Sequence, residues 1–136
     1  MTSLAEFRVY AVLPCSDFER ARTWYEEKLG LVPASEEMPG HAWYGFASGT
    51  WFILTTSAYA GTAQNTAAGF TVSGIEAVMD DLRSRGVEFL EYDFGEMGKT
   101  ENGLMAMGEY KAAWFKDSEG NILELSEAPS APATDG

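Results

Sequence analysis

The sequence predicts an α+β fold built from two tandem βαβββ modules, because two patterns occur twice along its 136 residues. A Ser-x-x-Glu pattern, typical of the first turn of a helix, begins at Ser16 and again at Ser73, an offset of 57 (73 − 16). An Ala-Trp pair followed by Gly begins at Ala42 and again at Ala113, an offset of 71 (113 − 42). The second copy therefore has 14 more residues (71 − 57) than the first between its predicted helix and the strand that contains its Ala-Trp pair. Function is expected between the halves or in this insertion.

Module one, about residues 5–57, begins with a strand predicted over Phe7–Leu13, which is rich in Val, Tyr and Phe. A helix follows over Asp17–Leu29, where apolar residues recur every three or four positions, and Gly30 ends it. A weaker strand, a loop and a hairpin turning at Ser48-Gly49 complete the module: Leu31–Ser35, Glu36–Gly40, and Ala42–Ala47 with Thr50–Thr56. Small residues, about 58–65, form the predicted linker.

Module two, about residues 66–127, repeats this order. Its helix presents an apolar face at i, i+3, i+4 and i+7 and ends at Gly86: Ile75, Val78, Met79 and Leu82. Its strands and turn are predicted at Gly69–Val72, Val87–Tyr92, Tyr110–Lys116, the turn Asp117–Asn121, and Ile122–Ser126. The insertion falls in Asp93–Glu109, whose glycines and methionines suit either the lip of a pocket or a flexible surface loop. The tail Ala128–Gly136 is expected to be frayed.

Composition narrows the classes of function. An apolar content of 46% suffices for one core, and a net charge of −12 repels phosphate backbones, so we expect a single domain, residues 1–136, that does not bind nucleic acid. The N-terminus has no apolar run long enough for a signal peptide or a membrane span. We therefore expect a cytoplasmic protein without a membrane partner. The lone cysteine, Cys15, is expected to be a small buried residue.

Three short motifs carry a family resemblance: Cys15–Ala21 leading to Trp24-Tyr25, then Leu29-Gly30-Leu31, and the closing Phe115-x-Asp117-x-x-Gly120-Asn121-x-x-Glu124. With the order of elements, they resemble the vicinal oxygen chelate superfamily, which includes glyoxalase I, extradiol dioxygenases, fosfomycin-resistance transferases and bleomycin-resistance proteins. The resemblance covers roughly residues 5–127. It implies a U-shaped mixed sheet around a cleft, and a homodimer in which each groove is built from both chains.

Enzymes of this superfamily hold a divalent metal with side chains from the first and last strands of each half. The resemblance places these positions at Tyr10, Ile53, Ala67 and Glu124. Ile and Ala offer no donor atom, and the only histidine, His41, lies at the start of the hairpin away from these positions. We therefore expect no metal and no other cofactor.

Strand alternation places every second residue on the expected cleft face. In the superfamily the aromatic residue at the position of Phe115 tends to face the helix, which would aim Trp114, and by repeat Trp43, at the cleft. They would then be flat platforms for a conjugated ligand, the alternative being that both belong to the core. The strand residues expected to line the cleft are Arg8 at its rim, Tyr10, Val12, Trp51, Ile53, Thr55, Ala67, Gly69, Thr71, Ile122 and Glu124.

The sequence thus favours a metal-free protein, similar to the bleomycin-resistance branch, that sequesters a bulky aromatic natural product or antibiotic. Polycyclic or enediyne-type ligands are favoured over cationic glycopeptides, although the charge of −12 suits the latter. The predicted ligand-binding residues are Tyr10, Trp43, Trp51, Ile53, Met105, Met107, Trp114 and Glu124. No catalytic residue is assigned. The alternatives are a metal-independent lyase, isomerase or cyclase with Glu124 as base and Tyr10 as acid, and a regulatory domain without a small ligand.

Overall fold

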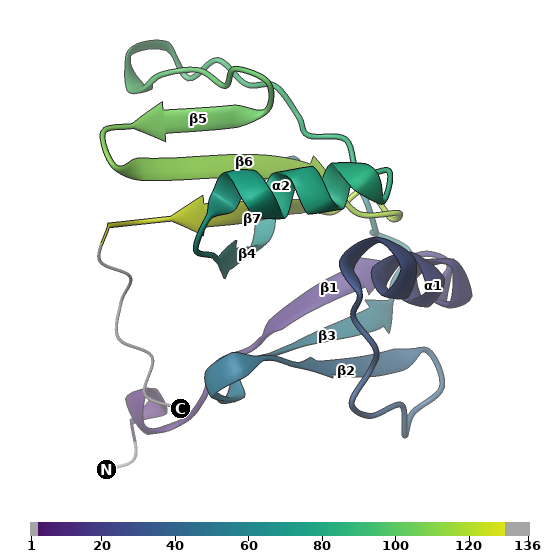
Figure 1. Ribbon diagram of the computed structural model, residues 1–136. Coiled ribbons are helices and arrows are strands. Elements are labelled where there is room, and N and C mark those ends of the chain that lie inside the picture. Colours follow the sequence, from purple (N-terminus) through teal and green to yellow (C-terminus); the bar gives the residue numbers. More distant parts are fainter. Residues whose placement is uncertain (1–2, 130–136) are drawn as a thin grey trace.

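The computed structural model describes residues 3–129, whose main elements are two α-helices and seven strands (Figure 1). In chain order these are β1 (Ala11–Cys15), α1 (Phe18–Leu29), β2 (His41–Gly45), β3 (Trp51–Thr56), β4 (Thr66–Thr71), α2 (Ile75–Ser84), β5 (Leu104–Met107), β6 (Tyr110–Lys116) and β7 (Ile122–Glu127). The predicted α+β class is confirmed. The tail expected to be frayed, 128–136, lies almost entirely outside the described residues.

The strands form two mixed sheets, which lie one above the other in Figure 1. The first has the order β1-β3-β2 and the second the order β4-β7-β6-β5. In each sheet the first strand runs parallel to the last strand of its module, and the remaining pairs are antiparallel. The two sheets come together where β1 contacts β4, and β1 and β4 are not paired as neighbouring strands of one sheet.

Each helix covers one face of its sheet. On that face every second strand residue points toward the helix, and these residues form the core. Against α1 lie the buried side chains of Tyr44 and Phe52, and α2 contributes Ile75 and Met79 to the same core. Cys15 is fully buried there as predicted, and burial raises the pKa of its thiol to about 11. We call the opposite surface of the sheets the helix-free face, which carries Val12, Trp43, Ile53, Trp114 and Glu124.

The first strand begins later than predicted. Instead of Phe7–Leu13, β1 spans Ala11–Cys15, because its parallel partner β3 begins at Trp51 and pairs from Ala11 onward. Pro14 lies within β1, where it is tolerated because β1 is at the edge of its sheet.

The predicted second strand of each module was wrong. Leu31–Ser35 and Val87–Tyr92 each form a single isolated bridge, Ser35 with Trp43 and Phe89 with Phe115. In module two the insertion explains the difference. Its strand β5 pairs with β6 over Tyr110–Ala113 and so occupies the edge of β6 where the predicted strand would have paired. Part of the insertion is therefore an ordered strand.

The helix caps also differ from the Ser-x-x-Glu prediction. Asp17 caps α1 by accepting a hydrogen bond from the backbone N–H of Arg20, and Ser16 lies outside the helix. Gly74 precedes α2 without any side-chain cap of its own. The backbone N–H groups of Gly74 and Ile75 instead donate to the carboxylate of Glu127. The pattern located both helices but not the groups that satisfy their first turns.

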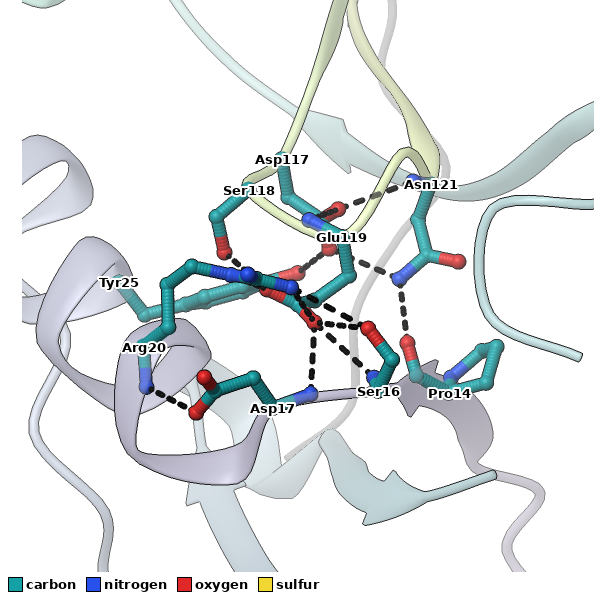
Figure 2. Close-up of polar contacts among 9 residues, drawn as sticks. All are labelled: Pro14, Ser16, Asp17, Arg20, Tyr25, Asp117, Ser118, Glu119 and Asn121. Carbon is teal, nitrogen blue, oxygen red and sulfur yellow. Dashed lines mark hydrogen bonds and ion pairs between the residues drawn. The ribbon is translucent and has the colours of Figure 1, made fainter. Parts of the chain in front are cut away.

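A turn between β6 and β7 joins module two to the beginning of α1 (Figure 2). Tyr25 donates its hydroxyl hydrogen to Asp117 Oδ2 at 2.6 Å, and Asn121 donates to the backbone oxygen of Pro14 at 2.8 Å. Glu119 Oε1 accepts from the backbone N–H of Asp17 at 3.0 Å. These bonds fix the orientation of one module against the other.

Glu119 is held as an anion in this turn. Its burial alone would raise its pKa, but the hydrogen bonds from Arg20 and from the backbone N–H of Asp17 outweigh burial and lower the pKa to about 2. The linker crosses the same turn at Gly61, where a Cβ atom would lie 2.6 Å from the backbone oxygen of Glu119. Only glycine fits this approach, at a φ of +74°.

Candidate ligand-binding site

Equivalent rows of side chains cross the helix-free face of the two sheets. In the first sheet Trp43 lies opposite Ile53, which lies opposite Val12. In the second sheet Trp114 lies opposite Glu124, which lies opposite Gly69. The rows match in their tryptophans and differ in the residue beside them, Ile in one half and Glu in the other.

Trp43 is the centre of a first aromatic cluster. Its ring lies 5.2 Å from that of Tyr10 and 5.6 Å from that of Trp51, at interplanar angles of 60° and 86°. The three rings line a hollow of about 480 Å³ together with Arg8, Val9 and Ser35. Tyr10 is 48% exposed and Trp51 38%, so both rings offer surface to a ligand.

Trp114 is the centre of a second aromatic cluster. Its ring lies 5.4 Å from that of Tyr92 at 88° and 5.3 Å from that of Phe94 at 59°. Trp114 is only 7% exposed, whereas Phe94 is 42% exposed, so the accessible surface of this cluster comes mainly from its neighbours. Tyr92 and Phe94 were not among the predicted site residues. The signal that could have found them is the aromatic sequence Tyr92-Asp93-Phe94 at the start of the insertion.

Glu124 is the acidic group of the second row. Burial raises its pKa, and the Trp114 side chain opposes this rise in part. Its carboxylate lies over Gly69, where a Cβ atom would be 3.3 Å from Glu124 Oε1. The absence of a side chain at Gly69 therefore leaves room for the carboxylate, which is placed to accept a hydrogen bond.

The donor set does not fit the metal that the fold class implies. The register pairs Ile53 with Val12 and Glu124 with Gly69, and Ala67 lies at an irregularity in the pairing of β4. None of these neighbours adds a donor side chain to Glu124. Within residues 3–129, no three His, Cys, Asp or Glu side chains are grouped in a way that could hold a metal ion.

His41 lies closer to the predicted cleft residues than expected. Its ring nitrogens are 3.1 and 3.3 Å from the hydroxyl of Thr55, which was predicted to line the cleft. The two residues are directly opposed across β2 and β3. The histidine is therefore at one end of the helix-free face rather than remote from it.

The methionines of the insertion line a different hollow. Met105 and Met107 lie with Tyr110, Ser126 and Thr71 around a space of about 340 Å³ that extends across the second sheet from β5 to β4. Ile53, although on the predicted face, is 5% exposed and offers little surface. The predicted residues are thus brought together in three groups rather than in one pocket.

Neither helix of the described structure has the length and apolar character that crossing a lipid bilayer requires.

One comparison with known proteins identifies a family. The family model described as "Glyoxalase/Bleomycin resistance protein/Dioxygenase superfamily" matches residues 8–125. No curated protein matches the chain.

Solved structures similar to this chain share its fold. The crystal structure of UcmS2 is 17% identical, with a TM-score of 0.70 and coverage of 90% of this chain and 100% of that chain. A glyoxalase/bleomycin resistance protein from Catenulispora acidiphila is 21% identical, with a TM-score of 0.66 and coverage of 90% and 99%. The fosfomycin resistance protein FosX from Listeria monocytogenes is 13% identical, with a TM-score of 0.65 and coverage of 90% of each chain. At these identities the similarity shows the fold alone.

Proposed function

The chain belongs to the glyoxalase/bleomycin resistance protein/dioxygenase superfamily, and we propose that it is a metal-free member that sequesters a bulky aromatic small molecule. The observation that carries the proposal is the pair of aromatic clusters centred on Trp43 and Trp114, at equivalent positions of the two modules. The favoured ligands are polycyclic or enediyne-type antibiotics.

The geometry of the clusters suits a flat, conjugated ligand. Trp43 meets Trp51 edge to face, and Trp114 meets Tyr92 edge to face, so each cluster has walls set at an angle to one another rather than a closed stack. When a planar ligand packs against one of these rings, each aromatic contact contributes about 0.5–1.5 kcal/mol of binding free energy beyond the burial of apolar area. Sequestration requires binding only, and aromatic contacts with a few polar groups are typical of small-molecule sites.

The polar groups favour binding over metal-assisted chemistry. Glu124 is the carboxylate beside Trp114, and its neighbours in the row offer no second metal donor. A carboxylate in that position can accept a hydrogen bond from a ligand hydroxyl or amine. By contrast, a mutant of FosX has been crystallised in complex with Mn(II) and 1S,2S-dihydroxypropylphosphonic acid.

The relatives support a role in resistance to a small toxic molecule. Both the Catenulispora protein and FosX are named as resistance proteins. We extend that role to this chain as self-resistance in the cytoplasm, by tight binding rather than by modification of the antibiotic.

A homodimer forms part of the same proposal. Several large apolar side chains on or next to the helix-free face are exposed: Val9 (92%), Val12 (54%), Met107 (47%) and Tyr110 (62%). Apolar surface gathered on one side of a small domain is typical of an interaction site. A second copy of the chain would cover part of it and complete the ligand groove.

The test is a titration with an uncharged flat polycycle, such as the anthracycline aglycone daunomycinone. We expect saturable quenching of tryptophan fluorescence, and recovery of the ligand unchanged by mass spectrometry after prolonged incubation. Absence of binding by this compound and by neutral polycyclic quinones would contradict the proposal.

One observation favours a second candidate, a metal-independent lyase, isomerase or cyclase. A carboxylate whose pKa is raised by burial is a better general base near neutral pH than an exposed one, and Glu124 is in that state. Tyr10, half exposed on module one, would be the acid. Conversion of a ligand by the parent protein, lost in Glu124→Gln, would establish the enzyme.

A further inference from the structure

We propose that Arg8 makes the Trp43 cluster selective for an aromatic ligand that carries an anionic group, such as a carboxylate attached to its ring system. The inference rests on the proposed function, since it names the chemical class of the sequestered ligand. It concerns the hollow that is lined by Arg8, Tyr10, Trp43 and Trp51.

Arg8 is held in place at the edge of this hollow. Its Nη1 donates to the backbone oxygen of Gly49 at 2.9 Å. The guanidinium packs directly on the turn between β2 and β3, because a Cβ atom at Gly49 would lie 2.6 Å from Nη1. The cation is thus fixed beside the aromatic rings by a backbone contact rather than by a counter-ion.

The charge of Arg8 has no partner among the residues that the structure describes. No carboxylate oxygen in residues 3–129 lies within 4.0 Å of its guanidinium, although the chain has 21 acidic residues. All other arginines are paired: Arg20 with Glu119, Arg22 with Glu36, Arg83 with Asp80 and Arg85 with Asp81. Arg8 is the exception in a chain with a net charge of −12.

The chemistry of the hollow combines a planar cation with aromatic walls. A guanidinium has five N–H groups in a fork that matches a carboxylate, and the bond to Gly49 engages one nitrogen. Tyr10 and Trp51 supply surface for a conjugated ring. An aromatic carboxylate satisfies both features at once, whereas an ammonium group at the same place would be repelled by the guanidinium.

The other parts of the helix-free face do not offer the same combination. In the hollow lined by Met105 and Met107, the charge of Lys111 is already paired with Glu76 at 2.9 Å. The Trp114 cluster has the carboxylate of Glu124 beside it, which disfavours an anion. The anionic end of the ligand is therefore assigned to the Arg8 side of the site.

Three probes of the same ring system test this assignment: anthraquinone-2-carboxylate, its neutral carboxamide, and 2-(aminomethyl)anthraquinone. Each is titrated by calorimetry and by tryptophan fluorescence into the parent protein and into Arg8→Gln, Arg8→Lys and Arg85→Gln. The last variant is a matched control, because it removes one positive charge just after the C-terminal end of α2, where Arg85 contacts Asp81. Thermal unfolding of every variant confirms that it is folded.

We expect the parent to bind the carboxylate about tenfold more tightly than the carboxamide, which corresponds to about 1.4 kcal/mol, and the ammonium probe most weakly. Arg8→Gln should remove the preference, because it weakens binding of the carboxylate far more than binding of the carboxamide. Arg8→Lys should retain part of the preference, because it keeps the charge but loses the fork. Arg85→Gln should bind all three probes as the parent does.

The outcomes separate the two proposals. Equal affinity of the parent for carboxylate and carboxamide would overturn the role of Arg8 and leave aromatic sequestration intact. An equal loss of all three probes in folded Arg8→Gln would likewise assign Arg8 a structural role only. Failure of all three probes to bind the parent would contradict both the inference and the proposed function.

Discussion

Trp114 and Glu124 face each other across β6 and β7, at the positions that Trp43 and Ile53 occupy across β2 and β3. The duplication has therefore kept the aromatic residue in both halves and changed the residue beside it. One end of the helix-free face is apolar with Arg8 at its rim, and the other carries a carboxylate whose pKa is raised by burial. A ligand that contacts both ends must itself be chemically different at its two ends.

Glu124→Gln should make the unliganded protein more stable at neutral pH. The raised pKa means that the folded state disfavours the ionised carboxylate, and glutamine removes that penalty while keeping nearly the same shape. The penalty is complete above the folded pKa and vanishes as pH falls below the ordinary value of 4.5, so the gain should be largest near pH 7 and disappear toward pH 4.5. Urea unfolding at several pH values measures it. A less stable variant at pH 7 would contradict the role assigned to burial.

Replacement of either central tryptophan should weaken binding of the neutral anthraquinone carboxamide. We expect a loss of about 1–3 kcal/mol for Trp43→Ala and for Trp114→Ala, measured by calorimetry. Trp114, at 7% exposed, should also cost about 3–5 kcal/mol of folding stability, so affinity is compared only after unfolding curves show folded protein. Trp24→Phe is the control, because Trp24 is partly buried and packs against Phe115 on the helix-covered side of the sheets, away from the clusters. Unchanged affinity in both folded Ala variants would remove the clusters from the site.

Purified protein should contain no stoichiometric Zn, Ni, Fe or Mn. The reason is the row Trp114, Glu124, Gly69, in which Glu124 is the only side chain with a hard donor for a divalent cation. Elemental analysis checks the content, and incubation with a chelator should leave the melting temperature unchanged. About one such metal per chain would show that a donor set has been overlooked.

Glu119→Gln should destabilise the protein strongly. The difference between a folded pKa of about 2 and the ordinary 4.5 corresponds to about 3 kcal/mol at neutral pH. Because this pKa is lowered by folding, the contribution is complete above pH 4.5 and is lost as pH falls toward 2. The free energies of unfolding of the parent and the variant should therefore become more similar as pH is lowered from 4.5 toward 2, as measured by urea unfolding. Glu88→Gln, at an exposed position, is the control and should behave as the parent does.

The protein should be a homodimer at micromolar concentration, because the apolar side chains of Val12, Met107 and Tyr110 are about half exposed or more. Sedimentation velocity should give twice the mass of the chain, and dilution should not release folded monomer at these concentrations. A single species with the mass of one chain would mean that the groove is formed without a partner. Met107→Glu should weaken the dimer, whereas Glu88→Gln should not.

Local patterns predicted the parts of the fold that local interactions determine. The periodicity of Ile75, Val78, Met79 and Leu82 located α2, and Gly30 ends α1 as predicted, in a left-handed conformation. The carboxylates of module two that accept hydrogen bonds at the start of each helix could not be predicted in this way, since Glu119 is 102 residues from Asp17 and Glu127 is 53 residues from Gly74.

The site shows the same division between local and long-range information. The family resemblance, combined with strand alternation, correctly placed Trp114 on the face opposite Phe115, which is fully buried beneath the helices. The contacts of Tyr92 and Phe94 with that tryptophan depend on the path of the insertion, and no local periodicity encodes that path. For the same reason the strand β5 was missed, because its short run of Leu, Met and Ala lies among glycines.

The turn at Asp117–Asn121 also bears on the history of the duplication. At the start of each helix, backbone N–H groups donate to a carboxylate of module two, Glu119 for α1 and Glu127 for α2. A gene cut at the linker near Gly61 would leave the first half without the acceptor for its own helix, while the second half would keep its acceptor. The two modules are therefore not equivalent, because module one depends on module two for this acceptor. Mutations that adapt module one to a new ligand must preserve its contacts with these residues of module two.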